Sequence, residues 1–322
     1  MAVECVVKHA AKSAAEGPHW DDITNTLLFV DILENTVHRY HPETGTVDVI
    51  QLDENVGFVV PARKGGLIAG VGRCLVHLDW DSKKVTKLHE VDHGLQTRFN
   101  DGKCDPQGRV WAGTMGPMVP TIEGMPKIGS LYRLDLDGSL HTMAKNFGIS
   151  NGLAWTADNK SMFFIDSTPR QIYRYDFDKS TGNISNQRVI VDNAGKSLDD
   201  CGFPDGMTVD QEDKLWVACF AASKVIRYDP ETGIAWFTYF QVLYRLPLNR
   251  SSAGQRLQHV EIPSASRITS CCFGGKNLDE LYVTSSAYEV SSEEFEKYPL
   301  SGSVFRVTDL GVRGRKAHIY EG

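Results

Sequence analysis

The chain has 322 residues, of which 41% are hydrophobic, 10% aromatic and 23% charged, and its formal net charge is −7. A chain of this length can bury a sizeable core, and closed all-β architectures reach this size as one unit, so we expect a single domain over residues 1–322. Charges of both signs are scattered, and neither a basic stripe nor an apolar run of about 18–20 residues occurs, which argues against nucleic-acid and membrane partners.

The N-terminus and the cysteines favour a cytoplasmic protein. Residues 1–5 include an acid and no basic segment precedes an apolar one, so we expect no signal peptide. The seven cysteines are odd in number and form no Cys-x-x-Cys pair, which predicts buried thiols in a reducing compartment. Cys271 and Cys272 are adjacent in a predicted strand, so their thiols should point to opposite faces.

A pattern of strands and turns repeats along the chain. A typical copy begins with Asn, Asp or Glu before Gly, passes through a short strand and a polar turn, and reaches a second strand rich in aromatic and β-branched residues. The six copies, two of them degenerate, begin at Glu16-Gly17, Gly57-Phe58, Asn100-Asp101-Gly102, Asn151-Gly152, Asp205-Gly206 and Ser270-Cys271. A third alternating strand follows, as at 37–40, 131–134, 172–175, 225–228 and 304–307.

The spacing of these copies predicts the fold class. They recur roughly every 40–55 residues, which is the length of one four-stranded propeller blade. The sequence therefore predicts an all-β, six-bladed β-propeller with a metal site on its axis. A non-repetitive β-sandwich is the alternative, and the recurrence of the copies argues against it.

One segment breaks the period. At residues 234–254 the distance to the next copy is too long by roughly 20 residues, and removing this segment restores the hairpin pattern of the other blades. We interpret it as an insert without catalytic duty, and a hydrophobic surface patch for a partner is the alternative. Deleting it should leave activity intact or raise stability.

Four of the repeated copies start with a residue whose side chain carries an oxygen atom. Glu16, Asn100, Asn151 and Asp205 occupy equivalent positions, and the first strand of each propeller blade lines the central channel, so these side chains should converge on the axis. Such ligands suit Ca²⁺, Mg²⁺ or Mn²⁺, and carboxylates can also hold Zn²⁺. Two carboxylates balance a divalent charge, whereas without a cation they repel each other. Asx-Gly pairs can also merely mark turns, but four pairs in register favour a metal site.

The chain resembles the regucalcin family, also called senescence marker protein 30 or gluconolactonase-like proteins, and is most similar to insect members of the luciferin-regenerating-enzyme type. The likeness covers nearly the whole chain apart from the insert. It is carried by the segments 16–20, 98–103, 112–115, 150–153, 204–207, 215–218 and 272–277.

The resemblance implies a six-bladed propeller that binds one divalent ion, whether Ca²⁺, Zn²⁺, Mn²⁺ or Mg²⁺, and that hydrolyses aldonolactones such as gluconolactone. It places the metal ligands on Glu16, Asn151 and Asp205 and the substrate contacts on Arg98 and Asn100. We expect Asp205 to act as the general base toward water, and Arg98 to hold the substrate's hydroxyls or its carbonyl oxygen. A small-molecule lactone is the expected partner, and we expect a monomer.

One segment departs from the family pattern. Vertebrate members carry acidic residues soon after the motif at 112–115, one of which reaches the substrate, whereas this chain continues with Gly116-Pro117-Met118-Val119-Pro120. Glu123 is the residue that we expect to replace that contact if the segment folds back.

Two other functions stay open at this point. The chain could be a calcium-binding regulator without significant turnover, or a hydrolase of a non-sugar substrate. A Ser-His-Asp hydrolase is disfavoured because no Gly-x-Ser-x-Gly sequence occurs. Asp101 and Lys103 are interpreted as supporting residues, and His19 as a turn residue.

Overall fold

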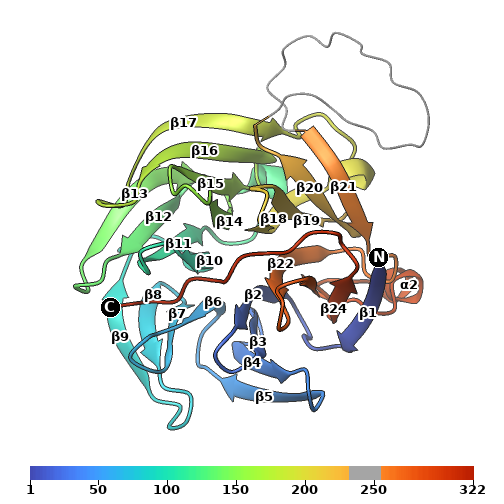
Figure 1. Cartoon of the computed structure of the whole chain (residues 1–322), viewed down its shortest axis with the longest axis horizontal. Coiled ribbons are helices and arrows are strands. Elements are labelled where there is room, and N and C mark those ends of the chain that lie inside the picture. The colour runs from blue at the N-terminus through green and yellow to red at the C-terminus, as the bar shows by residue number, and fades with distance from the viewer. Residues whose placement is uncertain (232–254) are drawn as a thin grey trace.

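The alternation of apolar and polar residues in each copy produces short antiparallel strands, as expected for half-buried sheets. In a computed structural model, residues 1–231 and 255–322 are described, and within them the chain forms six four-stranded sheets arranged around a central axis (Figure 1). The predicted six-bladed β-propeller is confirmed. The predicted insert at 234–254 lies outside the described residues.

Each of the first three sheets is built from four strands that are consecutive in the chain. The first sheet comprises β2 (Ala15–Asp21), β3 (Thr26–Asp31), β4 (Thr36–His41) and β5 (Thr46–Gln51). The second comprises β6 (Val56–Pro61), β7 (Leu67–Val71), β8 (Cys74–Leu78) and β9 (Val85–Glu90). The third comprises β10 (Arg98–Cys104), β11 (Val110–Met115), β12 (Gly129–Leu134) and β13 (Leu140–Phe147).

The next two sheets repeat the same order, and the last takes a strand from the N-terminus. The fourth comprises β14 (Ser150–Trp155), β15 (Ser161–Asp166), β16 (Gln171–Asp178) and β17 (Asn183–Asp192). The fifth comprises β18 (Phe203–Val209), β19 (Leu215–Phe220), β20 (Lys224–Asp229) and β21 (Gln255–Glu261). The sixth comprises β22 (Ile268–Gly274), β23 (Glu280–Ser285), β24 (Val304–Thr308) and β1 (Ala2–Val7).

The ring is closed by the N-terminal strand. β1 pairs antiparallel with β24, with Ala2 opposite Thr308 and Cys5 opposite Phe305. Because β1 precedes the first blade in sequence but completes the sixth in space, it joins the two ends of the propeller. This pairing was not predicted from the sequence.

The core lies between neighbouring blades. Phe163 and Ile165 of β15 pack with Val217 of β19 and Ile226 of β20, so the fourth and fifth sheets share one buried cluster. Buried Asp-x-x-Gly turns stabilise individual blades. In the third blade the carboxylate of Asp105 accepts hydrogen bonds from the indole of Trp111 at 3.0 Å and the guanidinium of Arg109 at 2.6 Å. All seven cysteines are free, and Cys271 and Cys272 belong to different core clusters, as predicted for adjacent strand residues.

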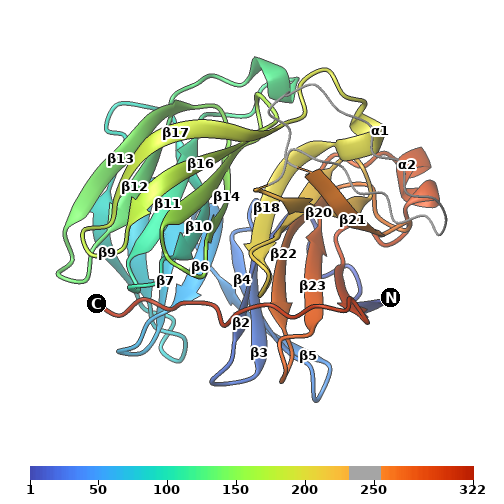
Figure 2. The ribbon, with the colours of Figure 1, turned by 45° about the horizontal axis from the view of Figure 1, so that its top comes forward.

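The C-terminal segment covers one mouth of the channel. It crosses the face of the propeller shown in Figure 1 and is tied to several blades, because Arg63 donates its backbone N–H to the carbonyl of Tyr320 and Gln211 donates its N–H to that of Arg313. Figure 2 shows the same segment running along one end of the inner strands. The starts of the inner strands therefore open at the other mouth.

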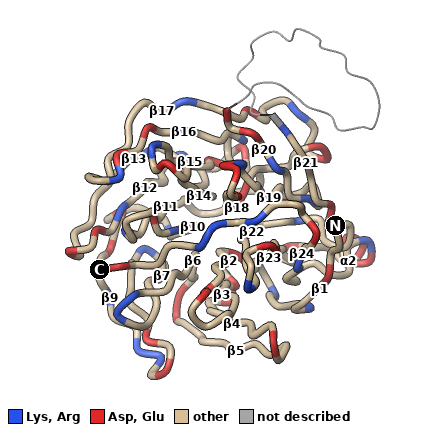
Figure 3. The backbone as a smooth tube through the Cα atoms, viewed as in Figure 1, with Lys and Arg blue, Asp and Glu red and all other residues tan. Residues whose placement is uncertain are grey.

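Helices are few among the described residues, namely a 3₁₀ turn at Ile122–Gly124, α1 (Leu198–Cys201) and α2 (Ser292–Lys297). None of them is long and apolar enough to cross a membrane. Lys and Arg are mixed with Asp and Glu over the blades (Figure 3), and a short basic run on the C-terminal segment is the clearest local cluster.

Candidate metal centre and active site

The innermost strands of the blades are bulged where the predicted site residues lie. The pairing of each first strand with the second is interrupted between Glu16 and His19 in β2, between Phe99 and Asp101 in β10, and between Pro204 and Met207 in β18. A bulge bends the strand and re-aims the side chains next to it. In four blades the bulge therefore lies at the Glu, Asn or Asp side chain that was predicted to face the axis.

Two blades have no ligand at the equivalent bulge. In β6 the position is Gly57, where an added Cβ would lie 2.5 Å from the carbonyl oxygen of Phe99, so only glycine fits against the next blade. In β22 it is Thr269, whose hydroxyl donates to the carbonyl of Ala15. The remaining four blades supply the side chains that were predicted to converge.

Hydrogen bonds join two of these blades through their amides. The Nδ2 of Asn100 donates to the Oδ1 of Asn151 and to the carbonyl of Ser150, both at 3.0 Å. The Nδ2 of Asn151 donates to the hydroxyl of Ser167 at 2.8 Å, and that hydroxyl donates to the carbonyl of Pro204 at 2.6 Å. Both amides are buried, and these contacts fix the orientation of the Asn151 oxygen.

The carboxyl groups of Glu16 and Asp205 lie together at the same place. They share a hydrogen bond, and both residues are buried. Burial, together with the charge of nearby Asp101, raises the pKa of Glu16 to about 8. Burial and the charges of Glu16 and Asp101 raise the pKa of Asp205 well above its usual range. Two buried acids in contact are unfavourable when both are ionised, and a cation between them removes this cost.

The donor set fits a hard divalent cation. Two carboxylates and the amide oxygen of Asn151 are oxygen ligands of the kind that Ca²⁺, Mg²⁺ and Mn²⁺ prefer. Within residues 1–231 and 255–322, no group of three or more His, Cys, Asp or Glu side chains is placed to hold a metal. The candidate centre has two carboxylates, so its third protein ligand has to be the amide oxygen of Asn151. The hydrogen bond from Asn100 suits a supporting role, because it orients this oxygen.

Arg98 provides the cation beside the two acids. Its Nη1 donates to the Oδ1 of Asn100 at 2.8 Å and to the carbonyl of Phe99 at 3.0 Å. Burial lowers the pKa of Arg98 to about 10, while the charge of Glu16 opposes this change. The guanidinium is therefore still charged at neutral pH, and its remaining N–H groups are available to a substrate oxygen.

These groups form the floor of a cavity of about 130 Å³. Its floor contains Glu16, Arg98, Asn100, Asn151 and Asp205, which includes every predicted site residue except Glu123. The walls are largely apolar and include Ile32, Leu33, Met115, Met118, Ile122, Ile149, Phe203 and Phe220.

Glu123 is not brought to this cavity. It lies in the 3₁₀ turn of the segment 116–128 and is exposed, whereas the preceding residue, Ile122, lines the cavity. The segment is held by packing of Ile122 and Val119 on a cluster of Met115, Met125 and Ile149. The segment therefore folds over the site as an apolar wall, with its acid turned to solvent.

The remaining polar residues of the motifs lie toward the other mouth. His19 and Lys103 line a separate cavity of about 420 Å³ beneath the C-terminal segment, together with Arg315 and His318. The ammonium of Lys103 donates to the carbonyl of Met207 at 2.6 Å, and burial lowers the pKa of His19 to about 4. This placement agrees with the interpretation of both residues as outside the catalytic group.

Comparison with known proteins identifies the family. The sequence profile described as "SMP-30/Gluconolactonase/LRE-like region" matches residues 14–239 and 248–287. The chain belongs to this family. The gap in the match falls within the predicted insert at 234–254. Membership in the SMP-30/gluconolactonase family supports a lactonase or calcium-binding role for the chain.

Full-length relatives agree with this assignment. The chain is 38% identical to regucalcin of Danio rerio over 321 residues, which cover 99% of the chain and 98% of the relative. Among solved structures, luciferin-regenerating enzyme has 35% identity and a TM-score of 0.85, with 100% of this chain and 99% of that one covered. A calcium-binding regucalcin from Agrobacterium tumefaciens has 23% identity and a TM-score of 0.84, with 100% and 98% covered, and shows the shared fold.

Some residues of the site were missed in the sequence of this SMP-30/gluconolactonase-family protein. Ser167 orients Asn151 but lies at the end of the second strand of its blade, outside the repeated Asx-Gly pattern. Phe220, the last residue of β19, and Tyr288, in the loop that follows β23, also line the cavity. Only their position just after a predicted strand could have indicated them, and many other residues share that position.

Proposed function

We propose that the chain is a metal-dependent lactonase. The observation that carries the proposal is the pairing of the buried carboxyl groups of Glu16 and Asp205 beside the oriented oxygen of Asn151, at the floor of a cavity that also holds a cationic Arg98. Family membership supports it. Aldonolactones such as D-glucono-δ-lactone are the substrates that the resemblance implies, and a calcium-binding role without turnover is the second candidate.

The residues of the floor match the needs of lactone hydrolysis. A divalent ion held by Glu16, Asn151 and Asp205 would supply positive charge that polarises the lactone carbonyl and acidifies water beside it. Arg98 is the proposed donor to the carbonyl oxygen as negative charge develops on it. The adjoining apolar walls exclude bulk water and strengthen these interactions.

Asp205 is the proposed general base. Its carboxylate takes a proton from the attacking water while the water oxygen forms a bond to the carbonyl carbon. The bond between that carbon and the ring oxygen then breaks, and Asp205 returns the proton to the ring oxygen, which becomes the hydroxyl of the product hydroxy acid. Asn100 contributes by keeping the oxygen of Asn151 turned toward the centre.

The test measures hydrolysis of D-glucono-δ-lactone and of unsubstituted δ-valerolactone with Ca²⁺, Zn²⁺, Mn²⁺, Mg²⁺ or EDTA. We expect turnover that EDTA abolishes, and loss of turnover in Asp205→Ala and Asn151→Ala variants whose circular dichroism matches the parent. Full activity in either variant rejects the site. Tight Ca²⁺ binding without turnover of any lactone would instead favour the calcium-binding role.

The cytoplasmic location, the monomeric state and the lack of nucleic-acid and membrane partners expected from the sequence are part of the same proposal. Size-exclusion chromatography with light scattering at micromolar concentration tests the monomer, and a dimer at that concentration would contradict it.

A further inference from the structure

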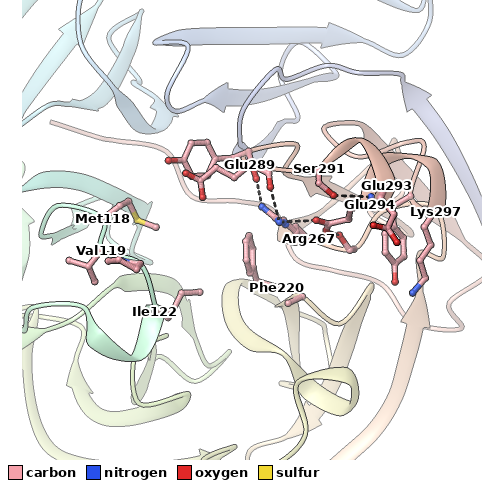
Figure 4. Close-up of a pocket in the computed structure, with 15 residues that line it drawn as sticks. Met118, Val119, Ile122, Phe220, Arg267, Glu289, Ser291, Glu293, Glu294 and Lys297 are labelled. Atoms are coloured by element: carbon pink, nitrogen blue, oxygen red, sulfur yellow. Dashed lines mark hydrogen bonds and ion pairs between the residues drawn. The ribbon is translucent and has the colours of Figure 1, made fainter.

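The small cavity opens into a larger groove. The groove has a volume of about 930 Å³, and Met118, Ile122, Phe220 and Tyr288 line both spaces. Figure 4 shows Met118, Val119 and Ile122 on one side of the groove and Glu293, Glu294 and Lys297 on the other. Phe220 lies between these two groups beside Arg267, whose guanidinium carbon is 5.9 Å from the centre of the Phe220 ring. The end of the groove next to the candidate centre is therefore its apolar end.

The cavity itself is small. An engineered cavity of about 150 Å³ binds benzene, so 130 Å³ is enough for a six-membered lactone ring but little more. A substituent on the ring has to leave through the opening between Met118, Ile122, Phe220 and Tyr288. Three of these four side chains are wholly apolar, and the fourth is an aromatic ring with one hydroxyl.

The Ser and Thr hydroxyl groups that line the cavity are already engaged with the protein. Ser167 donates to the carbonyl of Pro204, Thr269 donates to that of Ala15, and Ser286 donates to that of Ser13. Of the other polar groups, Glu16, Asn151 and Asp205 form the candidate centre, Asn100 orients Asn151, and Arg98 is assigned to the carbonyl oxygen of the ring. A polyhydroxylated lactone would have to bury hydroxyls with few partners left, which is costly, whereas an apolar substituent needs none.

The opening is apolar because of the segment 116–128. Met118 is 51% exposed and lies at the lip shared by the two spaces, so its side chain is open to a bound molecule. Glu123 faces solvent from the same segment, so no acid of the segment is available to bind sugar hydroxyls at the lip.

We propose that the preferred substrate is a lactone with an apolar alkyl substituent, whose ring lies over Arg98 and the two acids and whose chain lies along Met118, Ile122 and Phe220. This inference rests on the proposed lactonase activity and names its substrate class. Hydrolysis follows the step given above, with water added to the carbonyl carbon and the ring oxygen released as a hydroxyl, so the product is an alkyl hydroxy acid.

Three lactones with the same ring separate the alternatives, namely δ-valerolactone, its 5-pentyl derivative and D-glucono-δ-lactone, each assayed by acid release with the metal-loaded protein. Burial of one methylene changes an equilibrium about fourfold, so the pentyl compound should exceed both others in kcat/KM by at least about tenfold. Turnover of D-glucono-δ-lactone equal to or above that of the pentyl compound would overturn the inference and leave the lactonase proposal standing. No metal-dependent turnover of any of the three would reject both.

Variants at the lip test the chain's position. Met118→Glu should lower the ratio of kcat/KM for the pentyl compound to that for δ-valerolactone by about tenfold, and Phe220→Ala should lower it in the same direction. Met118→Leu keeps an apolar lip and should keep the ratio. Leu136→Glu, at an exposed turn between β12 and β13, adds the same charge elsewhere and should change nothing. An unchanged ratio in Met118→Glu and Phe220→Ala would show that the chain does not lie there.

Discussion

At the scale of single residues, the candidate centre combines two carboxyl groups with an amide whose orientation is fixed by its neighbours. The oxygen of Asn151 accepts from Asn100 at 3.0 Å, and its nitrogen donates to Ser167 at 2.8 Å. An amide held at both ends presents one oxygen in one direction. The fixed orientation of this oxygen should increase the affinity of the centre for a cation.

Replacing Asn100 tests this role. In Asn100→Ala the oxygen of Asn151 loses its donor, and loss of such a supporting contact typically weakens metal binding about 10–100-fold. Isothermal titration with Mn²⁺ or Ca²⁺ measures the change. Asn186→Ala, on an exposed strand where the side chain donates to Asp176, is the matched control and should bind as the parent does. Equal affinity in the two variants would contradict the role of Asn100.

A buried histidine far from the centre should make stability depend on pH. His38 is stacked on Phe29, and its Nε2 lies 2.8 Å from the hydroxyl of Thr36. Burial lowers its pKa to about 4 from an unfolded value of 6.5. The unfolded chain therefore binds more protons than the folded one between these values, so the stability contributed by neutral His38 is complete above pH 6.5 and is lost as pH falls toward 4.

We expect His38→Gln to flatten this dependence. The slope of the free energy of unfolding against pH should decrease by up to about 1.4 kcal/mol per pH unit, because the unfolded chain binds at most one more proton at His38 than the folded chain does. Urea unfolding at several pH values from 7 to 4 gives the free energy of unfolding for parent and variant. His141→Gln, at an exposed position, should leave the parent's slope, and an unaltered slope in His38→Gln would refute the assignment.

The site residues that could be predicted are those that repeat. Glu16, Asn151 and Asp205 stand before glycine in the first, fourth and fifth blades, where each inner strand bulges at the same place. Whether they hold a metal stays a prediction, although the structure brings them together. Glu123 could not be placed from sequence, because the course of its segment is decided by packing on Met115 and Ile149, which no local pattern records.

At the scale of elements, the hairpins of the blades follow directly from the alternation of apolar residues and the turn sequences. The second and third strands of each predicted copy are observed, including β15 with β16 and β19 with β20. The strands that were not predicted are those with exposed faces, such as β9, because they have too few buried residues to show a period of two.

The hairpin of β20 and β21 supports a test of the predicted insert. Asp229 and Gln255 are opposite each other in the register, so the two strands that flank residues 232–254 can be joined by a short turn without altering their pairing. A variant in which Asn-Gly replaces residues 232–254 has a four-residue loop, Pro230-Glu231-Asn-Gly, between Asp229 and Gln255. It should fold with a thermal midpoint equal to or above that of the parent, because four-residue loops are common in antiparallel hairpins and the shorter connection leaves less chain to order.

The same variant should retain lactone turnover, since the candidate centre is built from β2, β10, β14 and β18. Thermal unfolding and the δ-valerolactone assay measure the two outcomes. Loss of turnover with the fold retained would show that the segment contributes to function and would refute its interpretation as an insert without catalytic duty.

At the scale of the whole molecule, the propeller is closed by contacts between distant parts of the sequence. β1 pairs with β24, and the C-terminal segment donates the N–H of Tyr320 to the carbonyl of Pro61 in the second blade. Neither contact could be predicted from the repeats, because each joins residues hundreds of positions apart and neither segment carries the repeated pattern. Closure of the ring of blades is nevertheless needed for four inner strands to bring their site residues to one axis.

Removing the N-terminal strand should open the sixth blade. Deletion of residues 2–7 removes the antiparallel ladder with β24 and leaves that strand as an unpaired edge, and such an edge is prone to pair with other chains. If each lost backbone hydrogen bond is worth about 1 kcal/mol, the thermal midpoint should fall by roughly 5–10 °C. Differential scanning calorimetry measures the shift, and light scattering detects the association that we expect from the exposed edge.

A variant that keeps the strand separates closure from side-chain effects. Val3 is 41% exposed, so Val3→Thr retains the pairing and should unfold within about 1 °C of the parent, since exposed substitutions rarely alter stability by more than about 0.5 kcal/mol.

Metal affinity adds a second readout, because an opened ring no longer holds β2 firmly against β22, and Glu16 is carried by β2. The deletion variant should therefore bind Mn²⁺ more weakly than Val3→Thr does. A monodisperse deletion variant with the parent's thermal midpoint and affinity would show that the ring is held closed without β1.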